Sequence, residues 1–213
     1  GEDRAVLFPA WEVLPSEAMN PADDIVAERM NALKQLATAR DSGRLLHAVL
    51  PVRSLMQCVP ERERLLRDTV SLRVGEEHDL DDLVARLVRM GYERELMVEQ
   101  RGHMSVRGGI FDVFPISSEL PYRIEFFGDE IESIRRFEPE TQRSIDHVDS
   151  VQILPRSEKR LLAELADKPG ALSAVTDYLP KDALVVFDEP LAVVEEARKL
   201  EEQIGANPFF LTW

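Results

Sequence analysis

The segment MSVRGGIFDVFPISSELPYRIEFFGDEIESIRRF, from Met104 to Phe137, alternates runs of β-branched and aromatic residues with clusters of turn-forming residues. This pattern predicts an antiparallel meander. The expected strands are Ser105–Phe114, Tyr122–Phe127 and Ile131–Phe137. A turn-rich connector from Pro115 to Pro121 joins the first two strands, and Gly128-Asp129 forms the turn before the third.

Side chains point alternately to the two faces of a strand, so the residues of each predicted strand can be assigned to sides. In the second strand, the residues expected to face a core are Tyr122, Ile124 and Phe126. The opposite face then carries Arg123, Glu125 and Phe127. In the first strand, the same alternation groups Val106, Ile110, Asp112 and Phe114. Its other face carries Ser105, Arg107 and Phe111.

If the two mixed faces lie on the same side of the sheet, then Arg107, Arg123 and Phe127 form a patch that faces solvent. Two interpretations of this patch stay open. A single exposed Phe is ordinary, and an Arg beside a Glu on a sheet is usually a cross-strand pair of small energetic value. Arginine and aromatic residues are also the types that dominate protein-protein hot spots. The pattern itself names no partner.

The composition of this 213-residue chain is ordinary for a globular protein of one large or two small domains. No apolar run reaches the ~20 residues of a membrane span, and no signal-peptide pattern opens the chain. The single cysteine, Cys58, fits a reducing compartment and is expected to be a small buried hydrophobe. We therefore expect a cytoplasmic protein. Its net charge of −14 disfavours direct DNA binding.

The order of the predicted elements divides the chain into three segments. Residues 1–68 contain a strand at 5–8, a helix from Pro21 to about Ala39 and a short buried strand, Leu45–Leu50. Residues 156–213 continue with helices at 156–166 and 191–203, a break at Pro169-Gly170 and an apolar strand, Leu184–Phe187. Both segments are typical of a parallel α/β sheet, so the middle segment, residues 69–155, is predicted to be an inserted domain.

The middle segment contains one strong helix, Leu80–Met90. Asp79 is the expected N-cap, and Gly91 is the expected C-terminal stop. The apolar stripe of this helix consists of Leu80, Leu83, Val84, Leu87 and Val88. We expect the stripe to pack on the core face of the meander and to form a small α+β domain that Val151–Leu154 closes.

Asp188 and Glu189 follow the predicted strand Leu184–Phe187. An apolar strand that ends in acidic residues is typical of a Walker B element, whose carboxylate lies near Mg²⁺. However, the sequence has no G-x-x-x-x-G-K-[ST] loop to hold phosphates, so the pair is interpreted as a vestigial site or simply as the polar end of a strand. The sequence also lacks metal-ligand spacings and nucleophile motifs. We expect no catalytic residue, metal or cofactor.

Three runs within 105–144, SVRGGIFDVFP, SELPYRIEFFGDEIESIRRF and ETQRS, resemble the second domain of the bacterial transcription-repair coupling factors. They are similar, less closely, to the corresponding domain of the excision-repair protein UvrB. Two further stretches extend the resemblance to nearly the whole chain: FPAWEVLPSEAMNPADDIVAERMNALKQL (Phe8–Leu36) and LRVGEEHDLDDLVARLVRMGYERE (Leu72–Glu95). UvrB has a long tyrosine-rich hairpin where this chain has only Leu14–Asp24, which favours the coupling factors.

The resemblance implies a fold and a set of site residues. The fold is a degenerate, helicase-type (P-loop NTPase-like) parallel-sheet domain that has lost its nucleotide-binding motif, with an inserted α+β domain built on an antiparallel sheet. In both families the inserted domain docks UvrA. By motif, the UvrA-contacting positions of the coupling factors are the arginine of SVRGG, Arg107, and two residues of LPYRIEFF, Arg123 and Phe127.

The resemblance further implies a non-catalytic module that recruits UvrA and so couples stalled transcription to nucleotide excision repair. RNA polymerase, DNA, ATP and Mg²⁺ would then bind parts of such a factor outside this chain. Two alternatives stay open. A vestigial helicase domain could retain nucleotide or DNA binding at Asp188 and Glu189, or a regulatory module could mask its docking face against other domains of the full-length factor.

Overall fold

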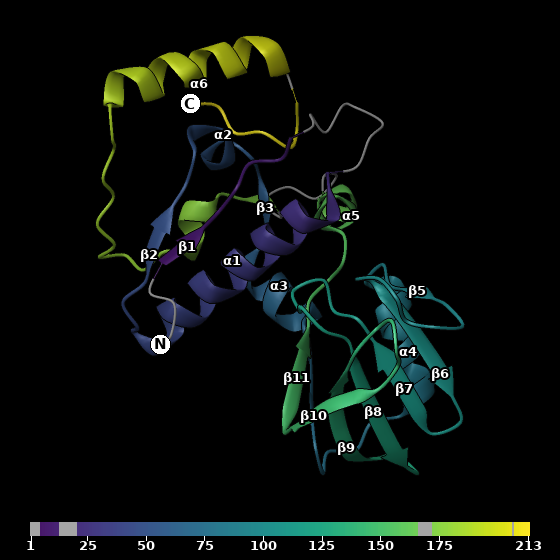
Figure 1. Ribbon diagram of the computed structural model, residues 1–213. Helices are drawn as coiled ribbons and strands as arrows, with labels where there is room; N and C mark the ends of the chain where they lie inside the picture. Colours follow the sequence, from purple (N-terminus) through teal and green to yellow (C-terminus); the bar gives the residue numbers. More distant parts are fainter. Residues whose placement is uncertain (1–4, 13–20, 166–171, 206) are drawn as a thin grey trace. The chain divides into compact units, whose positions relative to one another are not determined.

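The computed structural model describes residues 5–12, 21–165, 172–205 and 207–213 (Figure 1). The fold is mixed α/β and divides into two compact units. Unit 1 comprises residues 1–66 and 158–213, and unit 2 comprises the intervening residues 67–157. The predicted break at Pro169-Gly170 and most of the segment Leu14–Asp24 lie outside the described residues. None of the described helices is long and apolar enough to cross a bilayer.

Unit 1 is built from short strands and helices drawn from both ends of the chain (Figure 1). Its N-terminal elements are β1 (Ala5–Leu7), α1 (Asp23–Ser42), β2 (His47–Val49), α2 (Val52–Leu55) and β3 (Val59–Pro60). Its C-terminal elements are α5 (Glu158–Leu165), β12 (Leu172–Ser173), the 3₁₀ helix η1 (Val175–Tyr178) and α6 (Pro190–Ile204). The helix α3 (Arg62–Asp68) contains the point where the chain passes into unit 2.

The predicted strand-helix-strand pattern near the N-terminus is present. β1 and β2 pair in parallel, with Val6 opposite Ala48, and α1 connects them. The predicted strand within Leu45–Leu50 is present as β2, but the prediction that it is buried is wrong, because Leu45 and Val49 are exposed. Among the described residues this sheet has two strands, and only one of its faces is covered, because Val6 is buried whereas Ala5 and Leu7 are exposed.

The predicted strand Leu184–Phe187 is also wrong. This segment has no strand assignment, and all four of its apolar side chains are exposed before the chain enters α6. An apolar run alone cannot form a strand, because strand geometry depends on hydrogen bonds to a neighbouring backbone. No described segment supplies that neighbour.

A fully buried ion pair joins α1 to α5 inside unit 1. The guanidinium of Arg29 holds Glu158 in a two-point contact, with Nε–Oε2 at 2.7 Å and Nη2–Oε1 at 2.9 Å. The Trp11 indole donates to the same carboxylate at 2.9 Å, and Arg29 Nη1 donates to the Pro9 carbonyl and to Gln57 Oε1. Every charged atom is therefore matched by partners, as a buried charge requires.

Unit 2 consists of one sheet, one helix and a short strand pair. The strands of the sheet are β5 (Glu93–Arg94), β6 (His103–Arg107), β7 (Ile110–Val113), β8 (Tyr122–Phe127), β9 (Glu130–Phe137) and β10 (Ser144–Val148). They follow the order β10-β9-β8-β7-β6-β5. The remaining elements are β4 (Val70–Arg73), which pairs antiparallel with β11 (Ser150–Ile153), and the helix α4 (Leu80–Arg89).

The predicted meander is present, with one correction. Tyr122–Phe127 and the turn at Gly128-Asp129 are where the sequence predicts them, but Ser105–Phe114 is a hairpin rather than one strand. The chain reverses at Gly108-Gly109, where Gly108 has φ +61°. A side chain on Gly109 would have its Cβ 2.7 Å from the Phe126 carbonyl oxygen, so the close approach of the strands requires glycine there.

The helix α4 covers one face of this sheet (Figure 1). As predicted, Asp79 caps it, accepting a 2.9 Å hydrogen bond from the Asp82 amide. Leu83 and Leu87 are buried against Phe111, Ile124, Ile134 and other core residues, whereas Val88, expected in the same stripe, is exposed. The helix thus covers one side of the sheet and leaves the other side without a helix among the described residues of unit 2.

Candidate protein-docking surface

The face of the sheet opposite α4 carries most of the charged residues of the central strands, and we name it the arginine face. Paired residues in neighbouring antiparallel strands point to the same side, and the register places Ser105 opposite Asp112, Asp112 opposite Arg123, and Arg107 opposite Ile110. The arginine face therefore consists of Ser105, Arg107, Ile110, Asp112, Arg123, Glu125, Phe127, Ser133 and Arg135.

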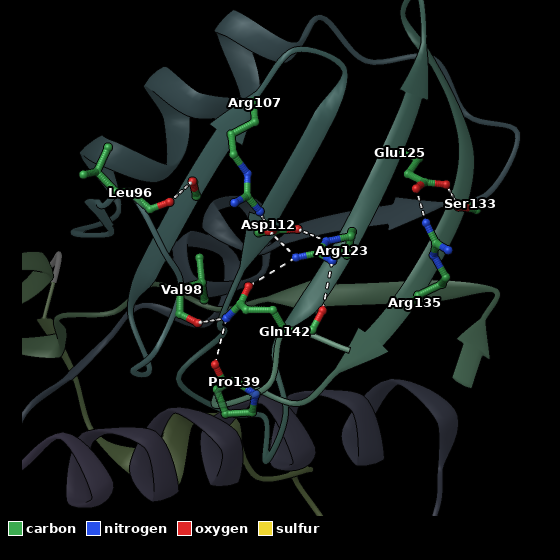
Figure 2. A network of polar contacts seen from close by, with 11 residues as sticks. Leu96, Val98, Arg107, Asp112, Arg123, Glu125, Ser133, Arg135, Pro139 and Gln142 are labelled. Carbon is green, nitrogen blue, oxygen red and sulfur yellow. Dashed lines mark hydrogen bonds and ion pairs between the residues drawn. The ribbon is translucent and has the colours of Figure 1, made fainter. Parts of the chain in front are cut away.

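Asp112 is the centre of this face (Figure 2). Its side chain is only 1% exposed and accepts hydrogen bonds from two arginines. Arg123 binds it with Nε–Oδ1 at 2.8 Å and Nη2–Oδ2 at 2.9 Å, and Arg107 Nη2 lies 2.7 Å from Oδ2. A buried carboxylate with three charge-assisted bonds holds both guanidinium groups in fixed positions.

Arg123 lies deeper in this network than the sequence suggests. Its Cζ lies 4.6 Å from the centre of the Phe137 ring, and its Nη atoms donate to the backbone and side-chain oxygens of Gln142 at 3.3 Å. The hydrogen bonds from Arg123 to Asp112 raise the pKa of the arginine. Only 16% of the side chain is exposed, so Arg123 lies mostly buried in the network and does not face solvent as the sequence predicts.

Arg107 and Phe127 are the open part of the arginine face. Arg107 is 49% exposed on its side chain even though Asp112 fixes its guanidinium. Phe127, at the end of β8, is 80% exposed. Between them, Glu125 is held by Arg135 and accepts a 2.8 Å hydrogen bond from the Ser133 hydroxyl. The surface thus presents one fixed arginine and one bare aromatic ring beside an ion pair.

The structure brings Arg107, Arg123 and Phe127 to one face, as the sequence predicts, but it corrects the assignment of three neighbours. Phe111 is in the core, and Ile110 and Asp112 lie on the arginine face, because the two-residue turn of the hairpin reverses the alternation after Arg107. The glycine pair between two alternating runs was the signal for this hairpin. No comparable signal marks Gln142, which comes from the loop between β9 and β10.

The predicted Walker B-like residues differ from this arrangement. Asp188 and Glu189 are exposed, follow an irregular segment and precede α6, with Glu189 in the left-handed region at φ +49°. Among the described residues, no group of three or more His, Cys, Asp and Glu side chains is arranged to hold a metal ion. Cys58 is buried as predicted, and burial raises the pKa of its thiol to about 11.

Comparisons with known proteins match both the middle of the chain and most of its length. The UvrB interaction domain family matches residues 70–158, which include the arginine face. Over 90% of its length, the chain is 39% identical to the transcription-repair-coupling factor of Mycobacterium tuberculosis. The corresponding factors of Bacillus subtilis and Escherichia coli are 37% and 36% identical over 84% and 70% of the chain. The chain spans 12–16% of the length of these relatives.

Proposed function

We propose that this chain, which belongs to the transcription-repair-coupling factors, is the part of such a factor that recruits UvrA through the arginine face of unit 2. The chain has no catalytic role in this proposal. Polymerase binding and ATP-driven translocation reside in other parts of the factor, as do the Mg²⁺ and nucleotide that they need. The recruited UvrA would bring the excision machinery to a stalled transcription complex.

One observation carries this proposal: an exposed Phe127 lies on the same face as the guanidinium of Arg107 that Asp112 holds, within the residues that match the UvrB interaction domain. Aromatic and arginine side chains are enriched in hot spots because they bury a large area and form several directed hydrogen bonds. Asp112 pre-organises Arg107, so less side-chain entropy is lost on binding. The face is therefore suited to a protein partner with an apolar pocket and an acidic rim.

For unit 1 we propose a degenerate helicase-type domain, supported by the parallel pair β1 and β2 with α1 between them. Nucleotide or DNA binding at Asp188 and Glu189 is the alternative function, and no observation favours it. Masking of the arginine face by another domain of the factor stays a prediction, as does the cytoplasmic location inferred from composition.

The proposal is tested by titrating the purified chain and its variants into UvrA by isothermal calorimetry. Phe127→Ala and Arg107→Ala are expected to weaken binding by about thirtyfold or more, the typical cost of a hot-spot truncation. Leu191→Ala and Arg89→Ala are matched controls, because both residues are exposed, Leu191 belongs to unit 1, and Arg89 belongs to α4, which covers the other face of the sheet. Binding of the controls should equal that of the parent.

Two results would contradict the proposal. The first is a parent chain that shows no heat with UvrA at micromolar concentrations. The second is a set of folded Phe127 and Arg107 variants that bind as tightly as the controls. A separate titration with ATP and Mg²⁺ addresses the alternative, and a heat that Asp188→Ala abolishes would favour the vestigial nucleotide site instead.

A further inference from the structure

The segment Glu95–Val98 places another exposed apolar residue at the edge of the arginine face. Leu96 is 90% exposed, more than any other large apolar side chain among the described residues. The bare ring of Phe127 is 80% exposed. Isolated exposed leucines are common on protein surfaces and need no explanation by themselves. The surroundings of Leu96 are what distinguish it.

Hydrogen bonds to the sheet and its loops hold the backbone of this segment. The Glu95 amide donates to the Met104 carbonyl at 2.8 Å, and the buried Ser105 hydroxyl donates to the Leu96 carbonyl at 3.2 Å. Gln142 Nε2 donates to the Val98 carbonyl at 3.3 Å. These bonds fix the main chain on both sides of an uncovered side chain, so the leucine is presented in one place.

The segment also rests on an apolar support. Val98 is fully buried in a small cluster with Phe114 and Phe137, and Phe137 lies under the guanidinium of Arg123. The same Gln142 side chain bonds both Val98 and Arg123. Figure 2 shows Leu96 at the edge of the sheet, on the side of Arg107. The segment that carries Leu96 is therefore connected, through Val98 and Gln142, to the network that holds Arg123.

We propose that Leu96 is a second apolar anchor of the arginine face and binds an apolar pocket on UvrA, with the half-exposed Met97 beside it. This inference rests on the proposed function and extends its contact surface to the outer side of β6. From strand spacing and rise, Leu96 and Phe127 are roughly 20 Å apart. That span fits within an ordinary interface of about 800 Å² per partner.

Because hydrogen bonds hold its backbone, Leu96 loses little main-chain freedom on binding and gains the burial of its whole side chain. We therefore expect Leu96→Ala to weaken UvrA binding by about tenfold, which corresponds to 1.4 kcal/mol. Because the side chain contacts little, the melting temperature should not change. The losses from Leu96→Ala and Phe127→Ala should multiply, since distant sites act additively in free energy.

Affinity is measured by calorimetry on the full chain, with Leu191→Ala as the control for removing an exposed leucine. If Phe127→Ala weakens binding and Leu96→Ala does not, the Leu96 anchor is wrong and the proposed function stands. If the parent chain does not bind UvrA, both proposals fail. Self-association of the parent without UvrA that Leu96→Ala abolishes would overturn the anchor, because its occupant would be a second copy.

A cross-linking experiment keeps the test independent of small changes in stability. Leu96→Cys is labelled with a benzophenone maleimide, and the parent, whose single cysteine Cys58 is buried, measures background labelling. Irradiation with UvrA is expected to give a cross-link from position 96 and from Phe127→Cys, but not from Leu191→Cys. A cross-link from position 127 without one from position 96 overturns the proposal.

Discussion

Asp112 and Arg123 show how a single residue can contribute to both the fold and the surface. Arg123→Ala would leave the buried Asp112 carboxylate with Arg107 as its remaining charged partner. Breaking a buried ion pair costs about 3–5 kcal/mol, and the bond from Arg107 places this case near 3 kcal/mol. We expect urea denaturation of Arg123→Ala to show a loss of that size.

The control for this prediction is Phe127→Ala, which removes an exposed ring and should change the unfolding free energy by no more than about 0.5 kcal/mol. Equal stability of the two variants would mean that Asp112 is less dependent on Arg123 than its hydrogen bonds indicate. The same point affects binding assays. A loss of UvrA affinity in Arg123→Ala would combine the loss of a direct contact with UvrA and the loss of the hydrogen bonds by which Arg123 positions its neighbours. Substitutions at Phe127 and Arg107 therefore test the contact with UvrA more directly.

The turns between the central strands determine whether the arginine face exists at all. Gly109→Ala would force its Cβ to within 2.7 Å of the Phe126 carbonyl oxygen, so the backbone of β7 or β8 must shift. Gly108→Ala meets no atom within 4 Å, but it places an alanine at φ +61°, which costs roughly 1–2 kcal/mol.

Thermal melts should therefore rank Gly109→Ala as less stable than Gly108→Ala. Gly128→Ala, in the open turn between β8 and β9 at φ +64°, should match Gly108→Ala and serves as the control. A Gly109→Ala variant with the same melting temperature as the other two variants would mean that the strands can move apart at this point without a loss of stability.

Sequence reasoning succeeded where an element depends on its own residues and failed where it depends on a neighbour. β8, β9, α4 and the Asp79 cap follow from local alternation, helical spacing and capping chemistry. The exposed segment Leu184–Phe187 has the composition of a strand, but whether such a run pairs depends on a partner elsewhere in the chain. Leu96 and Gln142 were missed for the same reason, because long-range hydrogen bonds give them their positions.

At the scale of the whole molecule, the buried pair Arg29–Glu158 ties the two ends of unit 1 together across the insertion of unit 2. Arg29→Ala leaves a buried, uncompensated carboxylate and should destabilise unit 1 by at least about 3 kcal/mol. Both tryptophans of the chain, Trp11 and Trp213, belong to unit 1, so tryptophan fluorescence reports its unfolding selectively.

The fluorescence transition of Arg29→Ala should therefore occur at a lower urea concentration than that of the parent. Replacing both partners with methionine should restore much of the loss, because an apolar pair can substitute for a buried ion pair. UvrA affinity of folded Arg29→Ala should equal that of the parent, since the proposed contacts lie in unit 2. A parallel loss of affinity would show that the arginine face depends on unit 1.

The last prediction is that residues 67–157 fold and bind UvrA alone. The core of unit 2 is drawn entirely from this range, and its two ends meet because β4 pairs with β11. Both ends are also fixed from within: Arg86 donates to the Arg67 carbonyl, and Tyr92 donates to the Leu154 carbonyl at 2.9 Å. We expect a cooperative melt by circular dichroism and the UvrA affinity of the whole chain.

Phe127→Ala in the fragment should weaken binding by the same factor as in the whole chain. A fragment that melts cooperatively and fails to bind UvrA would move the docking site to unit 1, whereas a fragment that does not fold would mean that unit 2 depends on the rest of the chain for its stability.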